Sequence, residues 1–330
     1  MDFTSIPATK SNAEERADAL AATTILRFYE QLDSLDAEAY QSVVHAVMHT
    51  HHSQSLFTLE SIESLHRDEY GRVSIADGLR SSACLIALRQ EIWSVLLYRR
   101  PFRLPLATDL NYDYLGPADD FIWTNRMIVW CADVIRYCFG PDTATILADS
   151  GKNLAFERWD AMKAFEERWT TSPPPCFSPL YYLPPDPDNG TYFPTVWQIN
   201  DCQVQCLQHL ELGRMLLAVY NPRRQRVGIG SSAMNKAVEQ QLRQSILCMC
   251  GLALGKKSFQ PGMTTAAIGI SIGGEYFHGA EEQNAIIDFL NKLEEEHAWP
   301  TMSVVLALRE AWNLQPTQST SSIPRGPASV

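Results

Sequence analysis

The sequence has no long uninterrupted apolar run and no signature of a common enzyme class. Its apolar runs are broken by charged residues well short of the 18 or more residues that a membrane-spanning helix needs. It has no G-x-S-x-G nucleophile motif, no P-loop and no dinucleotide fingerprint, and the glycines of VGIGSS (227–232) follow no strand pattern. We therefore expect no membrane span, no enzymatic activity and no cofactor.

Positive charge is also scarce. The 330 residues contain 27 Lys and Arg against 38 Asp and Glu, which gives a formal net charge of −11. Non-specific affinity for DNA comes mainly from Lys and Arg that neutralise phosphates, so we expect no direct DNA binding by this chain alone. Residues 1–16 contain neither the basic nor the apolar region of a signal peptide, and we expect none.

The chain has eight cysteines, but their positions argue against a disulfide framework. Most of them lie within apolar helical runs of a long chain whose composition, 45% hydrophobic, is sufficient for a sizeable core. We interpret them as reduced, buried thiols of an intracellular protein. The eight are Cys84, Cys131, Cys138, Cys176, Cys202, Cys206, Cys248 and Cys250.

Apolar residues recur with helical spacing along most of the sequence, and strand patterns are nearly absent. The pattern predicts an all-α protein with a single large domain of about ten helices over residues 16–312. We expect a loose N-terminus over residues 1–15 and a disordered Pro/Ser/Thr-rich tail over residues 313–330. The predicted helices cover residues 13–32, 36–50, 79–100, 119–140, 152–169, 201–220, 234–254, 264–277, 281–297 and 301–312.

The most proline-rich segment is 171–194, TSPPPCFSPLYYLPPDPDNGTYFP. Its prolines mark a candidate boundary, but it also carries five aromatic side chains, which a pure linker would lack. We interpret the segment as an ordered loop that packs across helices.

The segment NDCQVQCLQHLELGR (200–214) raises the question of a metal site. On a helix, Cys202 and Cys206 are one turn apart, but His209 is seven residues from Cys202, roughly 10 Å along the axis. A zinc ion with bonds of about 2.0–2.3 Å cannot comfortably take all three. Its remaining ligands would have to come from elsewhere in the chain. The candidates for this are Cys248, Cys250, His45, His49, His51 and His52.

We favour a core helix over a metal site or a catalytic thiol, because we find no paired catalytic pattern. The helical spacing predicts a buried stripe on one side and a wetter face on the other. The predicted buried stripe is Ile199, Cys202, Cys206, Leu210 and Leu217, and the predicted wetter face is Asp201, Gln205 and Gln208.

Three arginines cluster near the end of the helix predicted over 79–100. Arg99, Arg100 and Arg103 are the only site residues that we select, as contacts for a partner or an anion. The simpler interpretation is a favourable interaction with the C-terminal end of the helix dipole. The basic run PRRQR (222–226) is a weak candidate import signal, but a solvated loop is the simpler interpretation.

Four long segments together resemble one protein family. The resemblance spans roughly residues 60–312, and the sequence is similar to the C-terminal regulatory region of fungal zinc-cluster transcription factors, the fungal-specific transcription factor domain. The segments are LRSSACLIALRQEIWSVLLYRRPFRLPL, DDFIWTNRMIVWCADVIRYCFG, YFPTVWQINDCQVQCLQHLELGRMLLAVYNP and GISIGGEYFHGAEEQNAIIDFLNKLEEEHAWPT.

This resemblance implies an all-helical regulatory protein of the nucleus, often one that controls metabolic or secondary-metabolite genes. The DNA-binding module of the family opens as C-x2-C-x6-C beside a basic run, and no two cysteines here have the x2 spacing. The zinc ligands of the family therefore correspond to no residue of this sequence, and we expect no bound metal.

Regulation would then act through a protein partner, either a second copy or a full-length zinc-cluster factor, and through a small effector. The alternatives are a cytoplasmic helical scaffold or adaptor, and an enzyme of a biosynthetic gene cluster.

Overall fold

The computed structural model describes residues 13–33, 75–104, 106, 116–140, 152–224 and 227–313. This part of the chain contains nine α-helices and one two-stranded sheet, so the predicted all-α fold is confirmed. The helix predicted over 36–50, four of the candidate metal-binding histidines (His45, His49, His51 and His52) and the tail from 314 lie outside the described residues. The domain boundaries predicted at residues 16 and 312 stay predictions.

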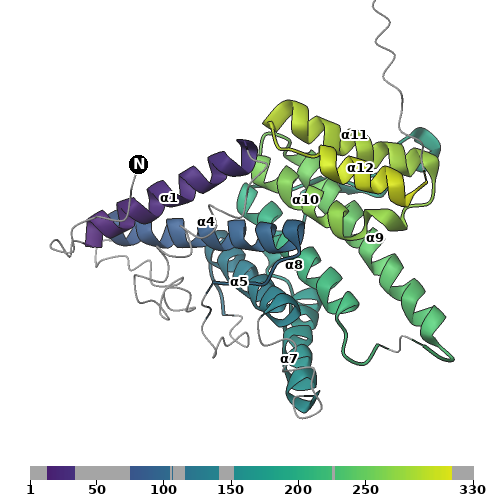
Figure 1. The fold of residues 1–330 in the computed structure, drawn as a ribbon, viewed down its shortest axis with the longest axis horizontal. Helices are drawn as coiled ribbons and strands as arrows, with labels where there is room; N and C mark the ends of the chain where they lie inside the picture. The colour runs from purple at the N-terminus through teal and green to yellow at the C-terminus, as the bar shows by residue number, and fades with distance from the viewer. Residues whose placement is uncertain are drawn as a thin grey trace, which may run out of the picture.

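In Figure 1, α1 lies along α4 at one end of the molecule, and α11 and α12 lie at the opposite end. The long helices between them form the centre. The helices are α1 (Ala13–Asp33), α4 (Ile75–Tyr98), α5 (Asp120–Phe139), α7 (Lys152–Thr171), α8 (Asp201–Val219), α9 (Ser231–Gly255), α10 (Gln260–Gly273), α11 (Ala280–His297) and α12 (Met302–Ala311).

The beginning of α5 follows from its sequence. The side chain of Asp119 accepts a hydrogen bond from the backbone N–H of Ile122 at 2.8 Å, which satisfies one of the free donors at the helix start. Asp120 adds negative charge to the same positive end of the helix dipole. The prediction that these two acids start a helix is therefore confirmed.

Helix α8 is the centre of the core, with α5 on one side and α9 and α10 packed elsewhere around it. Gly213 of α8 lies directly against the indole of Trp130 on α5, where a side chain would overlap the ring. Because neighbours surround it, α8 is buried on almost every face.

The face assignment predicted for α8 is therefore wrong in part. Ile199, predicted to be buried, lies before the helix and is 59% exposed. Gln205 and Gln208, predicted to be wet, are buried. The amide nitrogen of Gln208 is satisfied there because it donates to the backbone oxygens of Met249 and Gly262, at 3.0 and 2.9 Å.

The proline-rich segment before α8 is ordered, as predicted, but it contains a strand that the sequence pattern did not reveal. Strand β1 (Tyr181–Leu183) pairs antiparallel with β2 (Thr195–Trp197). The β2 backbone approaches α9 so closely that a Cβ on Gly251 or Gly255 would overlap a backbone oxygen of the segment 194–196. These two glycines thus create the space in which the hairpin packs.

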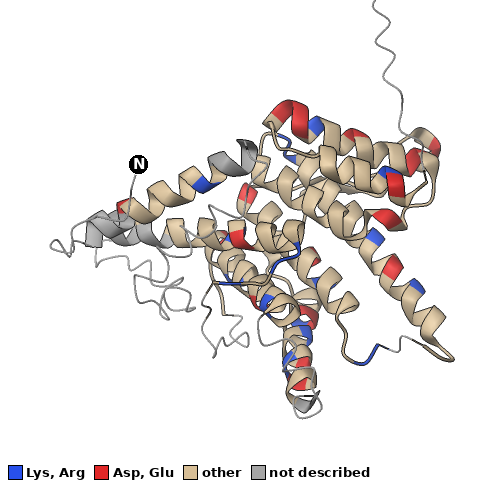
Figure 2. Ribbon diagram, in the orientation of Figure 1, with Lys and Arg blue, Asp and Glu red and all other residues tan. Residues whose placement is uncertain are grey.

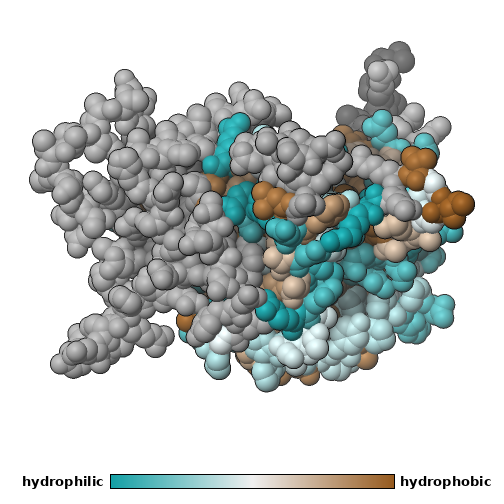
Figure 3. Space-filling view, turned by 90° about the horizontal axis from the view of Figure 1, so that it is seen from below, coloured by the Kyte–Doolittle hydropathy of each residue, from teal (hydrophilic) through white to brown (hydrophobic). Residues whose placement is uncertain are grey.

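Helix α10 is apolar and begins earlier than predicted, at Gln260 rather than Thr264, with Pro261 in its first turn. It carries no charged residue, whereas Asp and Glu recur along α11 (Figure 2). On the face shown in Figure 3, hydrophobic residues of the described part lie in small separate groups among hydrophilic ones. Within the described ranges, every helix is too short or too polar to cross a bilayer.

Candidate functional site

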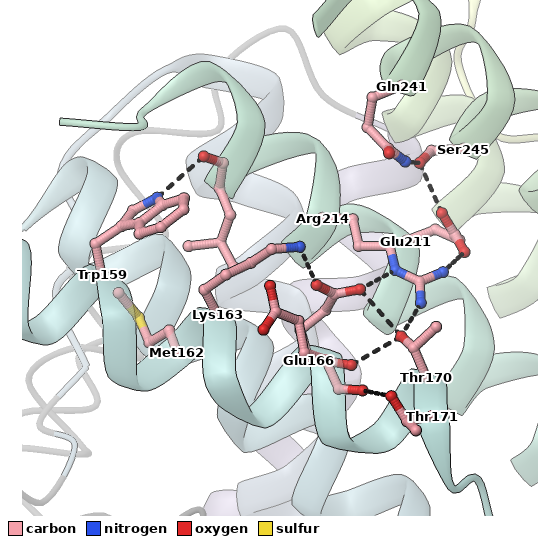
Figure 4. A network of polar contacts seen from close by, with 12 residues as sticks. Trp159, Met162, Lys163, Glu166, Thr170, Thr171, Glu211, Arg214, Gln241 and Ser245 are labelled. Carbon is pink, nitrogen blue, oxygen red and sulfur yellow. Dashed lines mark hydrogen bonds and ion pairs between the residues drawn. The ribbon is translucent and has the colours of Figure 1, made fainter. Parts of the chain in front are cut away.

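A groove of about 300 Å³ opens between α7, α8, the turn that follows α8, and the first half of α9. Its wall combines an ionic network, which Figure 4 shows together with Trp159, with a set of apolar side chains. The lining residues are Trp159, Lys163, Glu166, Arg214, Leu217, Ala218, Asn221, Arg224, Met234, Ala237, Val238 and Gln241.

Arg214 is the centre of the ionic network. Its Nε donates to Glu166 Oε1 at 2.6 Å and its NH1 donates to Glu211 Oε1 at 2.5 Å. Glu166 also pairs with Lys163 one turn earlier on α7. Glu211 accepts a further hydrogen bond, from the Ser245 hydroxyl at 2.6 Å. Two cations thus face two carboxylates, and this part of the groove is electrically balanced.

This pairing favours the charged forms of the Glu166 carboxylate and the Arg214 guanidinium. Burial alone would raise the pKa of Glu166, but hydrogen bonds and charge from Lys163 and Arg214 outweigh it and hold the pKa below its ordinary value. Burial works against the charged form of Arg214 too, and the charges of Glu211 and Glu166 raise its pKa above the ordinary value. The network is therefore a structural connection between α7 and α8.

A tight turn after α8 presents a third cation. The backbone N–H of Arg224 donates to Asn221 O at 3.0 Å, and the Asn221 side chain accepts from the N–H of Arg223 at 2.9 Å. Asn at the first position and Pro222 at the second favour this turn. The turn directs the two arginines differently: Arg223 pairs with Asp160 on the exposed surface, whereas Arg224 lines the groove.

Arg224 differs from the other two groove cations in its partners. Its NH2 donates to Asn235 Oδ1 at 2.8 Å and its NH1 to Val219 O at 3.5 Å, both of them neutral acceptors. Its Nε is buried and has no hydrogen-bond partner in the described part of the chain. Among the described residues, no carboxylate is hydrogen-bonded to this groove cation.

The remaining wall is apolar. The Trp159 indole N–H donates to Leu217 O at 3.1 Å, which fixes the ring against the last turn of α8. Leu217 and Ala218 continue this surface, and Met234, Ala237 and Val238 of α9 face it across the groove. An apolar surface beside a small number of oriented polar groups is typical of a small-molecule binding site.

The three arginines selected from the sequence have different environments. Arg100 forms two hydrogen bonds with Glu91, at 2.8 and 2.5 Å, and is largely buried. Arg99 and Arg103 are exposed, and Arg99 has a left-handed backbone with φ of 49°. The structure thus brings Arg100 to a carboxylate of its own chain, while contact of Arg99 or Arg103 with a partner or an anion stays a prediction.

The cysteines and His209 give no cluster of ligands. In the part of the chain that the structure describes, no group of three or more His, Cys, Asp or Glu side chains is arranged to hold a metal ion. All eight cysteines have free thiols, and Cys206 and Cys250 are buried. Burial raises the pKa of both thiols well above the ordinary value, which opposes a reactive thiolate.

His209 is buried in the core of α8. Its Nδ1 lies 2.8 Å from the Gln205 backbone oxygen, and because that oxygen can only accept, Nδ1 carries the proton. Its Nε2 has no partner among the described residues. Burial lowers the pKa of His209 to about 4, so the ring is neutral at pH 7. It acts as a structural side chain of the core.

A second surface feature lies on and beside the hairpin. Six large apolar side chains there are exposed, on both faces of the two strands, and together they are called the aromatic strip. The rings of Tyr181 and Trp197 pack at a centroid distance of 5.0 Å, and no member of the strip is charged. The members and their exposed fractions are Leu180 68%, Tyr181 41%, Tyr182 56%, Leu183 48%, Trp197 54% and Ile199 59%.

Searches of family models, of curated proteins and of solved structures found no match to this chain. Neither the groove nor the aromatic strip was among the sites selected from the sequence. The run LYYL between prolines was a visible signal for the strip, because adjacent Tyr and Leu side chains on a strand point to opposite faces and cannot all be buried in one core. The groove had no such signal, since its residues come from three separate stretches of the sequence.

Proposed function

We propose that this chain is a regulatory domain of the transcription-factor type, which controls metabolic or secondary-metabolite genes in the nucleus by binding a protein partner. The observation that carries the proposal is the aromatic strip. Exposed apolar patches of this kind mark interaction surfaces on folded proteins, and Tyr and Trp dominate the energetics of such surfaces.

The sequence resemblance supplies the regulatory part of the proposal. The excess of acidic residues is consistent with a chain that reaches DNA through its partner rather than through its own surface. The groove gives the same domain a place for a small effector. We propose no catalytic step, because no nucleophile with an activating base occurs among the described groove residues.

The test compares two lysine substitutions at equally exposed apolar positions. Tyr182 on the strip and Leu306 on α12 are both 56% exposed. We expect deletion of the gene to change the transcript levels of a set of genes. Wild type and Leu306→Lys should restore those levels, and Tyr182→Lys should not, although both variants should fold with the same far-UV circular dichroism.

The alternatives predict other results. If Tyr182→Lys restores the transcripts as well as wild type does, the strip is not the regulatory contact. If the purified chain converts a pathway intermediate, the protein is an enzyme and the regulatory proposal is wrong. A deletion that leaves all transcripts unchanged would favour a scaffold outside transcription. A DNA mobility shift by the chain alone would contradict action through a partner.

A further inference from the structure

We propose that the groove between α7, α8 and α9 binds a small monoanion with an apolar body, whose carboxylate is held by Arg224. This inference names the chemical class of the effector, so its biological role rests on the proposed function. The binding itself rests only on the geometry of the groove.

The charge of the groove selects an anion. Lys163 and Arg214 are neutralised by Glu166 and Glu211, whereas Arg224 has only amide and carbonyl oxygens as acceptors. A guanidinium that is partly removed from water normally has a carboxylate or phosphate partner. The Nε–H of Arg224 is a buried donor that has no hydrogen-bond partner among the described residues.

The α8 dipole does not remove this need. The carbonyl groups of the last turn carry about half an elementary charge in total, and Trp159 already occupies the Leu217 oxygen. Of these carbonyls Arg224 contacts the Val219 oxygen, at the long distance of 3.5 Å, so the helix end stabilises its charge only weakly.

The same balance limits the ligand to a single negative charge. Lys163 and Arg214 are already paired with Glu166 and Glu211, so the groove offers no second free cation to a further negative group on the ligand. A carboxylate satisfies Arg224, whereas a phosphate dianion would bring an excess of negative charge. The ligand is thus a monocarboxylate rather than a phosphorylated metabolite.

The rest of the wall selects an apolar body. Trp159, Leu217 and Val238 offer an apolar surface beside Arg224. The volume of about 300 Å³ lies at the lower end of the range for small-molecule sites. An eight-carbon chain fits this space, and its burial would supply affinity that a bare anion such as acetate lacks.

The test uses octanoate as the probe and titrates it into the full chain by isothermal titration calorimetry, with octan-1-ol and acetate as separate probes. Wild type should bind octanoate more tightly than either of them. Arg224→Gln should weaken octanoate binding by about tenfold to a hundredfold, the range for a lost charge-assisted hydrogen bond, and leave octan-1-ol unaffected. Ala237→Asp, which places a second acid in the groove, should weaken octanoate as well.

The matched control is Lys236→Gln, which removes one positive charge from an exposed side chain of α9 that does not line the groove. It should bind octanoate as wild type does. The inference is overturned if octanoate does not bind, if octan-1-ol binds equally well, or if Arg224→Gln and Lys236→Gln weaken octanoate alike.

The strip variant separates this inference from the proposed function. Tyr182→Lys should bind octanoate normally even where it fails to restore transcripts. If the chain binds octanoate but deletion of its gene changes no transcript level, the groove inference stands and the regulatory role is contradicted.

Discussion

The guanidinium of Arg100 holds the carboxylate of Glu91 through both terminal nitrogens, with NH1 to Oε1 at 2.8 Å and NH2 to Oε2 at 2.5 Å. Glu91 also accepts the backbone N–H of Arg103 at 2.9 Å and pairs with Arg27 of α1 at 3.4 Å. One buried carboxylate therefore connects α1, α4 and the chain that leaves α4.

Substitution of Glu91 should destabilise the protein strongly. Glu91→Gln would leave Arg27 and Arg100 without their shared counter-charge in a buried position, and we expect a loss of about 3–5 kcal/mol in the free energy of unfolding. Urea denaturation measures this loss. Arg99→Gln, at an exposed neighbouring position, should change stability by less than about 0.5 kcal/mol. Equal losses of stability in the two variants would show that the ion pairs of Glu91 do not contribute to the free energy of unfolding.

His209 should make stability depend on pH between about 6.5 and 4. Its pKa is about 4 in the folded chain and 6.5 when unperturbed, so the unfolded chain binds the extra proton across this window. Stability is therefore complete above pH 6.5 and falls as the pH falls, by up to roughly 3 kcal/mol.

The measurement for His209 is the free energy of unfolding at several pH values between 7 and 4.5. His209→Gln should flatten the curve across this window. A slope that survives in His209→Gln would mean that other groups carry the dependence.

Gly213→Ala should lower stability although alanine is the better helix former. The new methyl group would overlap the buried ring of Trp130, and overpacking of this kind costs about 1–3 kcal/mol. The gain in helix propensity, about 1 kcal/mol, offsets only part of that. Thermal melting of Gly213→Ala, and of Gly213→Ala combined with Trp130→Phe, tests the cause, because the smaller ring should recover part of the loss. A single variant that melts at or above the wild-type temperature would contradict the close contact.

The thiols should react with a disulfide reagent in two classes. Cys131, Cys138, Cys206 and Cys250 are buried, and burial raises the pKa of each thiol, so they should react only when the chain unfolds. The half-buried Cys202 should react in the native state, though slowly, because burial raises its pKa too. The absorbance of the chromophore that the reagent releases, read before and after urea is added, gives the number of thiols in each class. A stoichiometric metal in the purified protein would contradict free core thiols.

The sequence predicted most of the described helices well because they carry local signals, whereas α10 begins four residues before its predicted start. The acids at 119 and 120 begin α5, and the periodicity of apolar residues placed α11 within about a residue of its observed bounds, Ala280–His297. Such signals lie within a few residues of the structure that they specify, so tertiary context does not alter them.

The faces of α8 and the position of the groove were not predictable in the same way. Gln205 and Gln208 are buried because α8 has neighbours on most sides, and the partners of Gln208 lie on α9 and at the start of α10. Arg224 is a groove residue only because the turn at Asn221 brings it back to α8. Both outcomes depend on contacts between distant segments, which periodicity does not encode. Strand β1 was not predicted, because it is only three residues long and prolines on both sides of it argue against a strand.

Helix α9 connects the two surfaces of the molecule. Met234 near its start borders the groove, and Gly251 and Gly255 near its end lie under the backbone of β2. Its 25 residues span roughly 37 Å as one continuous helix. At that end the two glycines admit the backbone of the segment 194–196, and the side chain of Leu252 packs against Val196 of β2. One continuous helix therefore borders the groove at its start and supports the hairpin that carries the aromatic strip at its end.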